Sequence, residues 1–197
     1  MIKVVVFDVA GVLLKETWIK TMQTLLNDNS LTKSDVFELW QKEECFHQYE
    51  TGQLNTQQFV CLAKQALNIK LDDQTFSHIF NEMIVEPFKQ SEQVLNTIKQ
   101  NYKLAILSNT NPLHFEKIQS QYTIYQPCDY LFLSHQMGVM KPSKQIFNTM
   151  LDTLNCRPNE VMFFDDNQPN VAAARQLGIQ SELITEPQMA LDHLNLN

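Results

Sequence analysis

The sequence predicts an α/β fold: a doubly wound parallel sheet with a small helical segment inserted after its first strand. Three observations lead to this prediction. Short apolar runs typical of strands alternate with helical patterns along the C-terminal half of the chain, as they do in parallel sheets covered by helices. Two of these runs end in acidic residues. The long segment between the first run and the others has helical periodicity.

The first predicted strand is residues 3–7, where three valines and a phenylalanine follow one another without a polar break. Such a run is typical of a strand that is buried on both faces. Asp8 follows directly, and Gly11 allows the chain to turn tightly behind it. Because open α/β sheets bind ligands at the carboxyl ends of their strands, Asp8 is a candidate functional residue.

Residues 16–88 are predicted to form a compact helical bundle, inserted into an α/β domain made of residues 1–15 and 89–197. Three helix starts in this insertion have a side-chain oxygen at the N-cap and apolar residues on both sides. They are Thr32, Asn55 and Asp72. Gly52 suits the end of a further helix. That helix is expected to hold Trp40, Phe46 and Tyr49.

After the insertion, strands and helices alternate. The predicted strands are residues 103–107, 130–133, 161–164 and 182–184. The first predicted helix is residues 91–100, capped by Ser91, and a second begins at Asn111-Pro112. A third follows Lys141-Pro142-Ser143 and runs to about Leu154, and a fourth ends at Gly178. This alternation is what predicts the parallel order of the sheet.

Composition excludes several classes of function. The chain has 197 residues, of which 44% are hydrophobic, enough for a sizeable core. A net charge of −7 and a pI near 5.2 argue against nucleic acid or an anionic membrane as a partner. No apolar stretch approaches the ~20 residues of a membrane span. The four cysteines show no C-x-x-C pairing, so we expect a reduced, cytoplasmic protein without a zinc site. The sequence does not indicate an oligomeric state.

Acidic residues end two of the predicted strands, at Asp8 and at the pair Asp165-Asp166. In a parallel sheet these carboxylates emerge at one edge, where they repel one another unless a cation lies among them. Asp8 is a candidate nucleophile, since aspartate attacks phosphorus in enzymes that form aspartyl-phosphates. Asp166, together with Asp165, is a candidate ligand for a hard cation such as Mg²⁺ opposite Asp8.

Two further polar groups are expected at the same edge. Ser108 and Asn109 follow the strand 103–107, and with nearby backbone N–H groups they can hold phosphoryl oxygens. Lys141 precedes a helix, and it can neutralise both the phosphate and the nucleophile. Plainer interpretations stay open for each: Asp8 and Ser108 as turn residues, the acidic pair as a helix cap, and Lys141 as a surface lysine.

Together these motifs resemble those of the haloacid dehalogenase superfamily. The matching pieces are Asp8-Val9-Ala10-Gly11-Val12, Ser108, Lys141-Pro142 and Asp165-Asp166, in the family's order along nearly the whole chain. Residues 46–52 and the Ser-Asn-Thr-Asn run at 108–111 are similar to one subgroup in particular. That subgroup contains bacterial α-glucose-1-phosphate phosphatases and the phosphatase half of soluble epoxide hydrolase.

The resemblance implies a Mg²⁺-dependent phosphatase that hydrolyses a small phosphorylated metabolite, such as a sugar phosphate, through an aspartyl-phosphate. In this interpretation the helical insertion is a cap that covers the active site. Asp8 and Lys141 are then catalytic, and Ser108, Asn109 and Lys141 bind the substrate. The implied metal ligands are Asp8, the backbone carbonyl of Ala10, Asp166 and Asp165.

One residue departs from the family pattern. Most phosphatases of the family have a second aspartate two residues after the nucleophile, and this chain has Ala10 there. The missing carboxyl protonates the leaving group, a contribution of roughly 10²–10⁴ in rate. The similar subgroup also tends to have a small residue at this position. We therefore expect a preference for leaving groups that need little protonation.

Two rival interpretations follow from Ala10. A metal-independent 2-haloacid dehalogenase also uses an aspartate nucleophile and needs no acid, because halide leaves unprotonated. A catalytically silent binding or regulatory member of the fold needs neither a nucleophile nor a general acid. The retained Asp8, Lys141 and Asp166 argue against the silent member, and the acidic pair argues against the dehalogenase. His47 is expected either to pack within the insertion or to contact the substrate.

Overall fold

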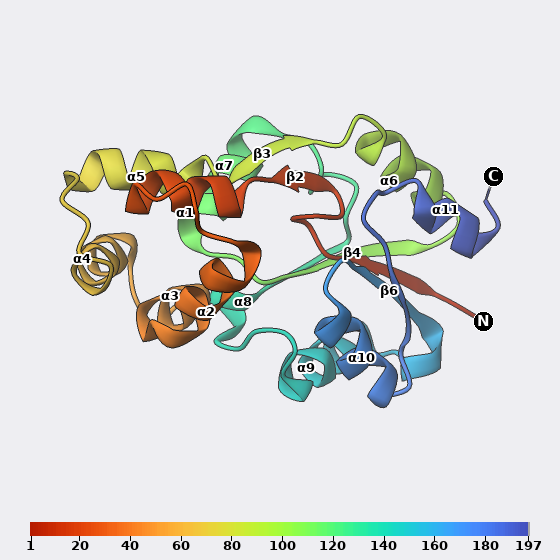
Figure 1. Cartoon of the computed structure of the whole chain (residues 1–197). Helices are drawn as coiled ribbons and strands as arrows, with labels where there is room; N and C mark the ends of the chain where they lie inside the picture. The colour runs from red at the N-terminus through yellow and green to blue at the C-terminus, as the bar shows by residue number, and fades with distance from the viewer. Residues whose placement is uncertain (197) are drawn as a thin grey trace.

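The computed structural model describes residues 1–196 and contains a five-stranded, wholly parallel sheet in the order β5-β4-β1-β6-β7 (Figure 1). The strands are β1 Val4–Phe7, β4 Lys103–Ser108, β5 Tyr130–Leu133, β6 Val161–Asp165 and β7 Gln180–Leu183. The predicted fold class is confirmed. The last strand begins two residues earlier than predicted, because it is short and only partly buried and has no unbroken apolar run to mark it.

The first strand lies at the centre of the sheet, and its position fixes where the site is built. In register, Phe7 is opposite Ile106 of β4 and Phe164 of β6. β1 ends at Phe7, and its neighbours end only one and two residues further on, at Asp165 and Ser108, so the three strands end at the same edge. All four residues of β1 are buried, as the unbroken apolar run predicted.

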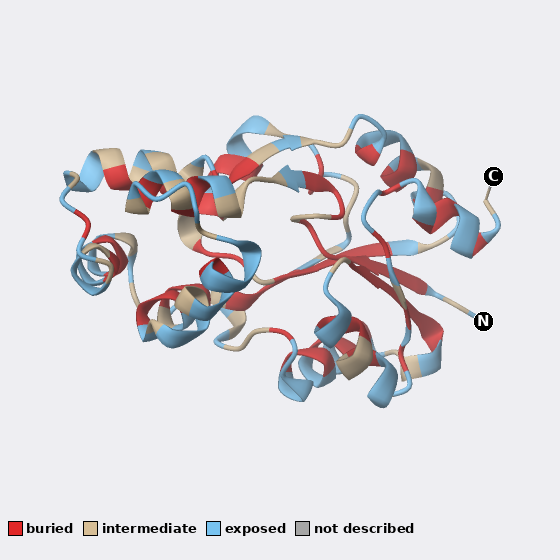
Figure 2. Ribbon diagram, viewed as in Figure 1, coloured by how far each residue is buried: buried red, intermediate tan, exposed pale blue. Residues whose placement is uncertain are grey.

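Helices cover both faces of the sheet (Figures 1 and 2). One face packs against α6 Ser91–Lys99, α7 Pro112–Gln121 and α11 Met189–Leu194. The other packs against α9 Lys144–Leu154 and α10 Gln168–Gln176. Two short helices, α8 Ser134–Met137 and the 3₁₀ turn η1 Pro158–Glu160, complete this part of the chain. No helix among the described residues is both long and apolar enough to cross a membrane.

The helical insertion has a core of its own. Its helices are α1 Trp18–Leu26, α2 Lys33–Lys42, α3 Glu44–Glu50, α4 Thr56–Ala66 and α5 Asp73–Asn81. An aromatic cluster holds them together, in which the rings of Phe46, Phe59 and Phe80 contact one another. The three predicted N-caps are confirmed, since the side chains of Thr32, Asn55 and Asp72 accept from the backbone N–H three residues on.

A two-stranded antiparallel sheet connects the insertion to the rest of the chain. It pairs β2 Leu14–Glu16 with β3 Ile84–Pro87, a stretch that the periodicity placed in the helical bundle. That prediction was wrong because the pairing joins residues about seventy positions apart, and strands of three and four residues carry no local signal of it. The insertion boundaries 16–88 stay a prediction, and residue 197 lies outside the described residues.

Two other local predictions were wrong. Ser91 does not cap α6: it is the first residue of the helix, and its buried hydroxyl donates to the carbonyl of Leu13 at 2.6 Å. Trp40 does not share a helix with Phe46, because the chain becomes extended at Glu43 and separates α2 from α3. Both errors arise because long-range contacts, which a local pattern does not contain, decide these conformations.

Candidate active site

Three carboxylates meet at the edge where β1 and β6 end. Asp8 continues β1, Asp165 ends β6, and Asp166 follows it. The backbone N–H of Asp8 donates to the carbonyl of Phe164 at 2.8 Å, which extends the pairing of the two strands to the acids. One oxygen of each carboxylate lies within 4.8 Å of one oxygen of the other two. The sheet register therefore gathers acids that are more than 150 positions apart in the sequence.

Lys141 lies between two of these acids. Its Nζ is 2.9 Å from Asp8 Oδ1 and 2.7 Å from Asp165 Oδ2, and the side chain is almost wholly buried. Burial alone would lower the pKa of Lys141, but the charges of Asp165 and Asp8 raise it above its ordinary value, so the ammonium stays charged. A surface role for Lys141 is excluded by this burial.

One ammonium does not balance three carboxylates. Burial, together with repulsion from Asp165 and Asp166, raises the pKa of Asp8 to about 7 against the attraction of Lys141. The pKa of Asp166 is raised by burial and by Asp165. A cation among these oxygens would favour the ionised forms. The donor set is all oxygen, which suits a hard cation such as Mg²⁺ rather than zinc.

The two acids of the pair have different surroundings. Both oxygens of Asp165 accept hydrogen bonds, from the backbone N–H of Asn167, the side-chain amide of Asn170 and Lys141. This carboxylate is fully buried and its acceptor capacity is largely used. Asp166 is partly exposed, so it has more freedom to bind a metal. The geometry therefore favours Asp165 as the group that positions Lys141.

Gly11 brings the loop after β1 into contact with Asp166. A side chain at position 11 would collide with Asp166 Oδ2, and the glycine has a φ of +80°. The loop that contains Ala10 thus passes directly beside the acidic cluster. The metal role predicted for the Ala10 carbonyl has this proximity in its favour.

Asn109 holds the loop of Lys141 in place. Its side-chain amide donates to the Lys141 carbonyl at 2.9 Å and accepts from the Lys141 backbone N–H at 2.8 Å. Both polar atoms of the amide are thereby occupied, so Asn109 can offer a phosphate its backbone N–H. Ser108, which ends β4, is buried, and its hydroxyl makes only a long 3.4 Å hydrogen bond to the Asn109 carbonyl. That hydroxyl is available to a phosphoryl oxygen.

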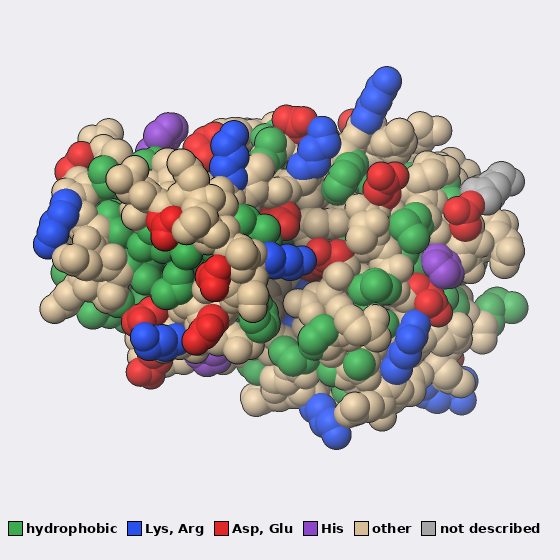
Figure 3. Space-filling view, in the orientation of Figure 1, with side chains coloured by type: hydrophobic (Ala, Val, Ile, Leu, Met, Phe, Trp, Pro, Cys, Tyr) green, Lys and Arg blue, Asp and Glu red, His purple; other side chains and the backbone are tan. Residues whose placement is uncertain are grey.

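The insertion contributes one acid that sequence reasoning missed. Glu50, the last residue of α3, is buried, and the charges of Lys141 and Asp8 both act on its carboxyl. Its place at the end of a helix with a buried aromatic face was readable from the sequence, but the packing of that helix end against α8 was not. His47 on the same helix is exposed. Figure 3 shows acidic and basic side chains gathered at the seam between the insertion and the α/β part.

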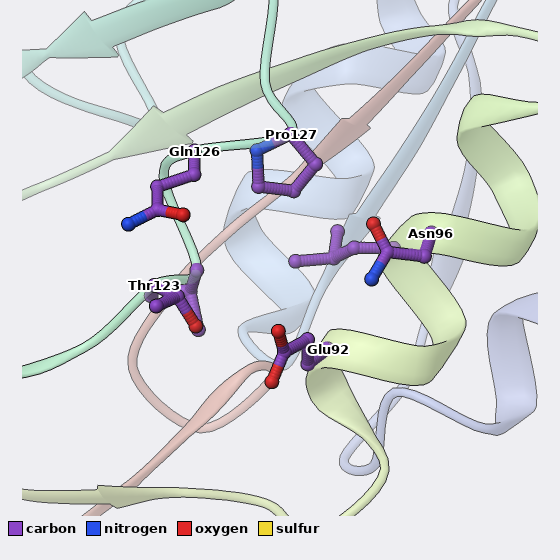
Figure 4. Close-up of a pocket in the computed structure, with 7 residues that line it drawn as sticks. Glu92, Asn96, Thr123, Gln126 and Pro127 are labelled. Atoms are coloured by element: carbon purple, nitrogen blue, oxygen red, sulfur yellow. The ribbon is translucent and has the colours of Figure 1, made fainter.

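A separate surface pocket of about 250 Å³ lies between α6 and residues 123–127 (Figure 4). The side chains that line it include Glu92, Asn96 and Thr123, and none of its lining residues is a predicted site residue. It has no cluster of charged groups comparable with the acidic edge. The chemistry of the described residues is concentrated at the ends of β1, β4 and β6.

Comparison with known proteins agrees with this geometry. A family model for haloacid dehalogenase-like hydrolases matches residues 2–178. The chain is 26% identical over 191 residues to D-ribitol-5-phosphate phosphatase of Bacteroides thetaiotaomicron, with 92% of this chain and 91% of the relative covered. It is 25% identical to bifunctional epoxide hydrolase 2 of Sus scrofa, a match that covers 98% of this chain but only 38% of that longer protein.

Solved structures show the same fold. A haloacid dehalogenase family enzyme of Bacteroides thetaiotaomicron, in complex with magnesium and inorganic phosphate, superposes with a TM-score of 0.79 at 22% identity over 93% of this chain and 94% of that one. A hydrolase of the same type from Porphyromonas gingivalis gives a TM-score of 0.81 at 24% identity over 99% and 97% of the two chains. The arrangement of sheet and insertion is therefore shared.

Proposed function

Because the chain belongs to the haloacid dehalogenase-like hydrolases, we propose that it is a Mg²⁺-dependent phosphatase acting on a small phosphate ester, such as a sugar or polyol phosphate. The observation that carries the proposal is the pairing of Asp8 with buried Lys141 beside two further carboxylates. The relative that hydrolyses D-ribitol 5-phosphate, as its name states, supports the substrate class.

The reaction proposed has two steps. In the first, an Asp8 oxygen attacks phosphorus, the bond from phosphorus to the substrate oxygen breaks, and an aspartyl-phosphate forms. In the second, water attacks phosphorus and releases phosphate and free Asp8. Lys141 holds the nucleophile in place and offsets its charge, while Ser108 donates to a phosphoryl oxygen. Asp8, Asp166 and the Ala10 carbonyl would hold a Mg²⁺, which would offset the negative charge of the phosphoryl group.

The dehalogenase and the silent binding module rank below the phosphatase. A metal-free dehalogenase leaves the excess of carboxylates in this cluster without compensation, and its substrates carry no phosphoryl group for Ser108 to contact. An L-2-haloacid dehalogenase of Xanthobacter autotrophicus superposes with a TM-score of 0.65 at 18% identity, a likeness of fold alone. A catalytically silent module does not require a buried lysine paired with Asp8, as Lys141 is here.

The test is a phosphatase assay of the purified chain on sugar and polyol phosphates, with Mg²⁺ and with excess chelator. We expect phosphate release with Mg²⁺ and almost none with chelator. Asp166→Asn should weaken Mg²⁺ activation, whereas Asp152→Asn, an exposed acid on α9, should behave as the native protein does. Full activity in chelator would reject the metal-dependent mechanism, and dehalogenation of a 2-haloacid in its place would establish the rival.

A further inference from the structure

A phosphate ester of an alcohol needs a proton donor, because an alkoxide is a poor leaving group. The sheet edge offers no suitable donor, because the Lys141 ammonium is held between Asp8 and Asp165, which raise its pKa. Asp8 is used in the attack, and both oxygens of Asp165 already accept hydrogen bonds. Asp166 is proposed to bind the metal, and Ala10 carries no titratable group. If the chain hydrolyses alkyl phosphates efficiently, a side chain of the insertion is the remaining candidate for the proton donor.

Glu50 reaches the site from the insertion. It ends α3, its side chain is about nine-tenths buried, and the indole N–H of Trp40 donates a hydrogen bond to its carboxyl. The charges of Lys141 and Asp8 both affect the pKa of this carboxyl, and the end of α3 that carries it packs against α8 beside the sheet edge. A leaving group departs on the side of phosphorus opposite Asp8, towards the insertion.

The position of Glu50 is fixed by contacts across the seam. Two residues on, Gly52 adopts a φ of +70°, and a side chain there would collide with the carbonyl of His135 on α8. Ser134, the first residue of α8, accepts a hydrogen bond from the backbone N–H of Thr110 and donates one to its carbonyl. Thr110 lies in the loop after β4. The end of α3 is thus held against the loops that carry Ser108 and Lys141.

The surroundings of Glu50 raise its pKa, so that its protonated and ionised forms are both accessible near neutral pH. Burial raises the pKa of Glu50 to about 7, while the Trp40 hydrogen bond and Lys141 act in the opposite direction and Asp8 adds to the increase. On α8, the pKa of His135 is lowered by burial, so that ring is neutral. On α4, Lys64 pairs with Asp73. A carboxyl in this state can give up a proton and later take one back.

We propose that Glu50 is a catalytic residue that donates its proton to the leaving-group oxygen, the task that Ala10 cannot perform. This inference rests on the proposed phosphatase function. As the Asp8–phosphorus bond forms and the ester bond breaks, the Glu50 proton passes to the departing oxygen and an alcohol leaves. The Glu50 carboxylate then accepts a proton from the water that hydrolyses the aspartyl-phosphate.

Glu16 is the rival acid, and its position suits the task less well. It lies on β2, where its carboxylate accepts from the backbone N–H of Trp18 at 3.2 Å. The charges that act on it are those of Asp166 and Lys33, on the metal side of the cluster. The pKa of Glu50 is instead affected by the charges of Asp8, the proposed nucleophile, and Lys141.

The experiment compares Glu50→Gln with the native protein on an aryl phosphate and on a primary alkyl phosphate. Glutamine keeps an acceptor for Trp40 but has no proton of comparable acidity. We expect kcat/KM to fall by roughly 10²–10⁴ for the alkyl ester and to change little for the aryl ester. The decline of native activity on the alkyl ester as pH rises above 7 should disappear in the variant. Glu44→Gln, an exposed acid on the same helix, should leave both substrates unaffected.

The results distinguish failure of the proposed Glu50 role from failure of the proposed phosphatase function. Equal losses on both esters, or no loss on either, would overturn the role of Glu50 while the phosphatase itself stands. Restoration of alkyl turnover by Ala10→Asp in the Glu50→Gln background would support it, because a second acid then supplies the proton. A native protein that hydrolyses neither ester overturns the proposed function and the inference together.

Discussion

The sheet edge and the helical insertion position their polar groups in different ways. At the edge, strand register places Asp8, Asp165 and Ser108, and Lys141 pairs directly with Asp8 and Asp165. In the insertion, an aromatic core supports α3, which carries the buried acid Glu50. Glu50 takes part in none of the ion pairs found among the described residues. The first arrangement is suited to holding a nucleophile, and the second to a group that gains and loses a proton.

Asp8→Asn should cause the largest loss of activity of the substitutions considered. The change is nearly isosteric and removes the nucleophilic oxygen, so we expect activity on any phosphate ester to fall by on the order of 10⁴ or more with little change in fold. Steady-state phosphate release and circular dichroism measure the two effects. The exposed Asp152→Asn is the matched control. Activity near the native rate in Asp8→Asn would show that another group attacks phosphorus.

Lys141→Met should damage both stability and activity. It leaves Asp8 and Asp165 buried without their shared cation, and loss of one partner of a buried ion pair costs about 3–5 kcal/mol in the free energy of unfolding. Denaturant unfolding measures this loss. Lys144→Met, an exposed lysine three residues later, should change the unfolding free energy little. Similar unfolding curves for the two variants would contradict the structural importance of the buried pair.

His114 joins the two regions, and its removal should alter the acid stability of the protein. The ring is buried on α7, with Nε2 3.1 Å from the carbonyl of Phe80 in the insertion and Nδ1 3.0 Å from the Asn111 amide. Burial lowers the pKa of His114 to about 4. Between this value and the ordinary 6.5, the unfolded state binds more protons than the folded one. Stability is therefore expected to fall as pH drops through this window, by up to about 3 kcal/mol.

The measurement is the free energy of unfolding at pH 7 and pH 4.5 for His114→Gln and for the exposed His78→Gln. The native protein and His78→Gln should lose more stability on acidification than His114→Gln does. Buried carboxyls that titrate in the same range are common to all three proteins, so they cancel in the comparison. The same pH slope in every protein would show that His114 is not buried in its neutral form.

Gly52→Ala tests the seam directly, and its effect is judged against a matched glycine. Alanine at either Gly52 or Gly138 pays the cost of a left-handed conformation, roughly 1–2 kcal/mol. At Gly138 nothing lies near the added methyl group, whereas at Gly52 it meets the His135 carbonyl. Gly52→Ala should therefore be the less stable of the two and should lose activity on alkyl phosphates. Equal melting temperatures and activities would mean that the seam tolerates displacement of α3.

The same contrast explains what the sequence could predict. The meeting of Asp8, Ser108 and Asp165 at one edge could be predicted because buried strands have a clear apolar signature and parallel strands end at one edge. Helix starts such as Asn55 were found because capping is local. Glu50 was missed because the direction of a side chain on α3 depends on how the insertion packs against the sheet. The β2–β3 pairing and the Ser91–Leu13 bond were missed for the same reason.

The β2–β3 ribbon has a mechanical consequence. The chain enters and leaves the insertion through paired strands, and further bonds join Thr17 to Met83 at 2.9 Å and Phe88 to Leu13 at 3.0 Å. A single linker would let the insertion swivel about its own axis. A hydrogen-bonded ribbon removes that torsional freedom, because twisting separates the bonded pairs. We therefore expect the insertion to move relative to the sheet by bending of the ribbon, a rocking motion and not a twist.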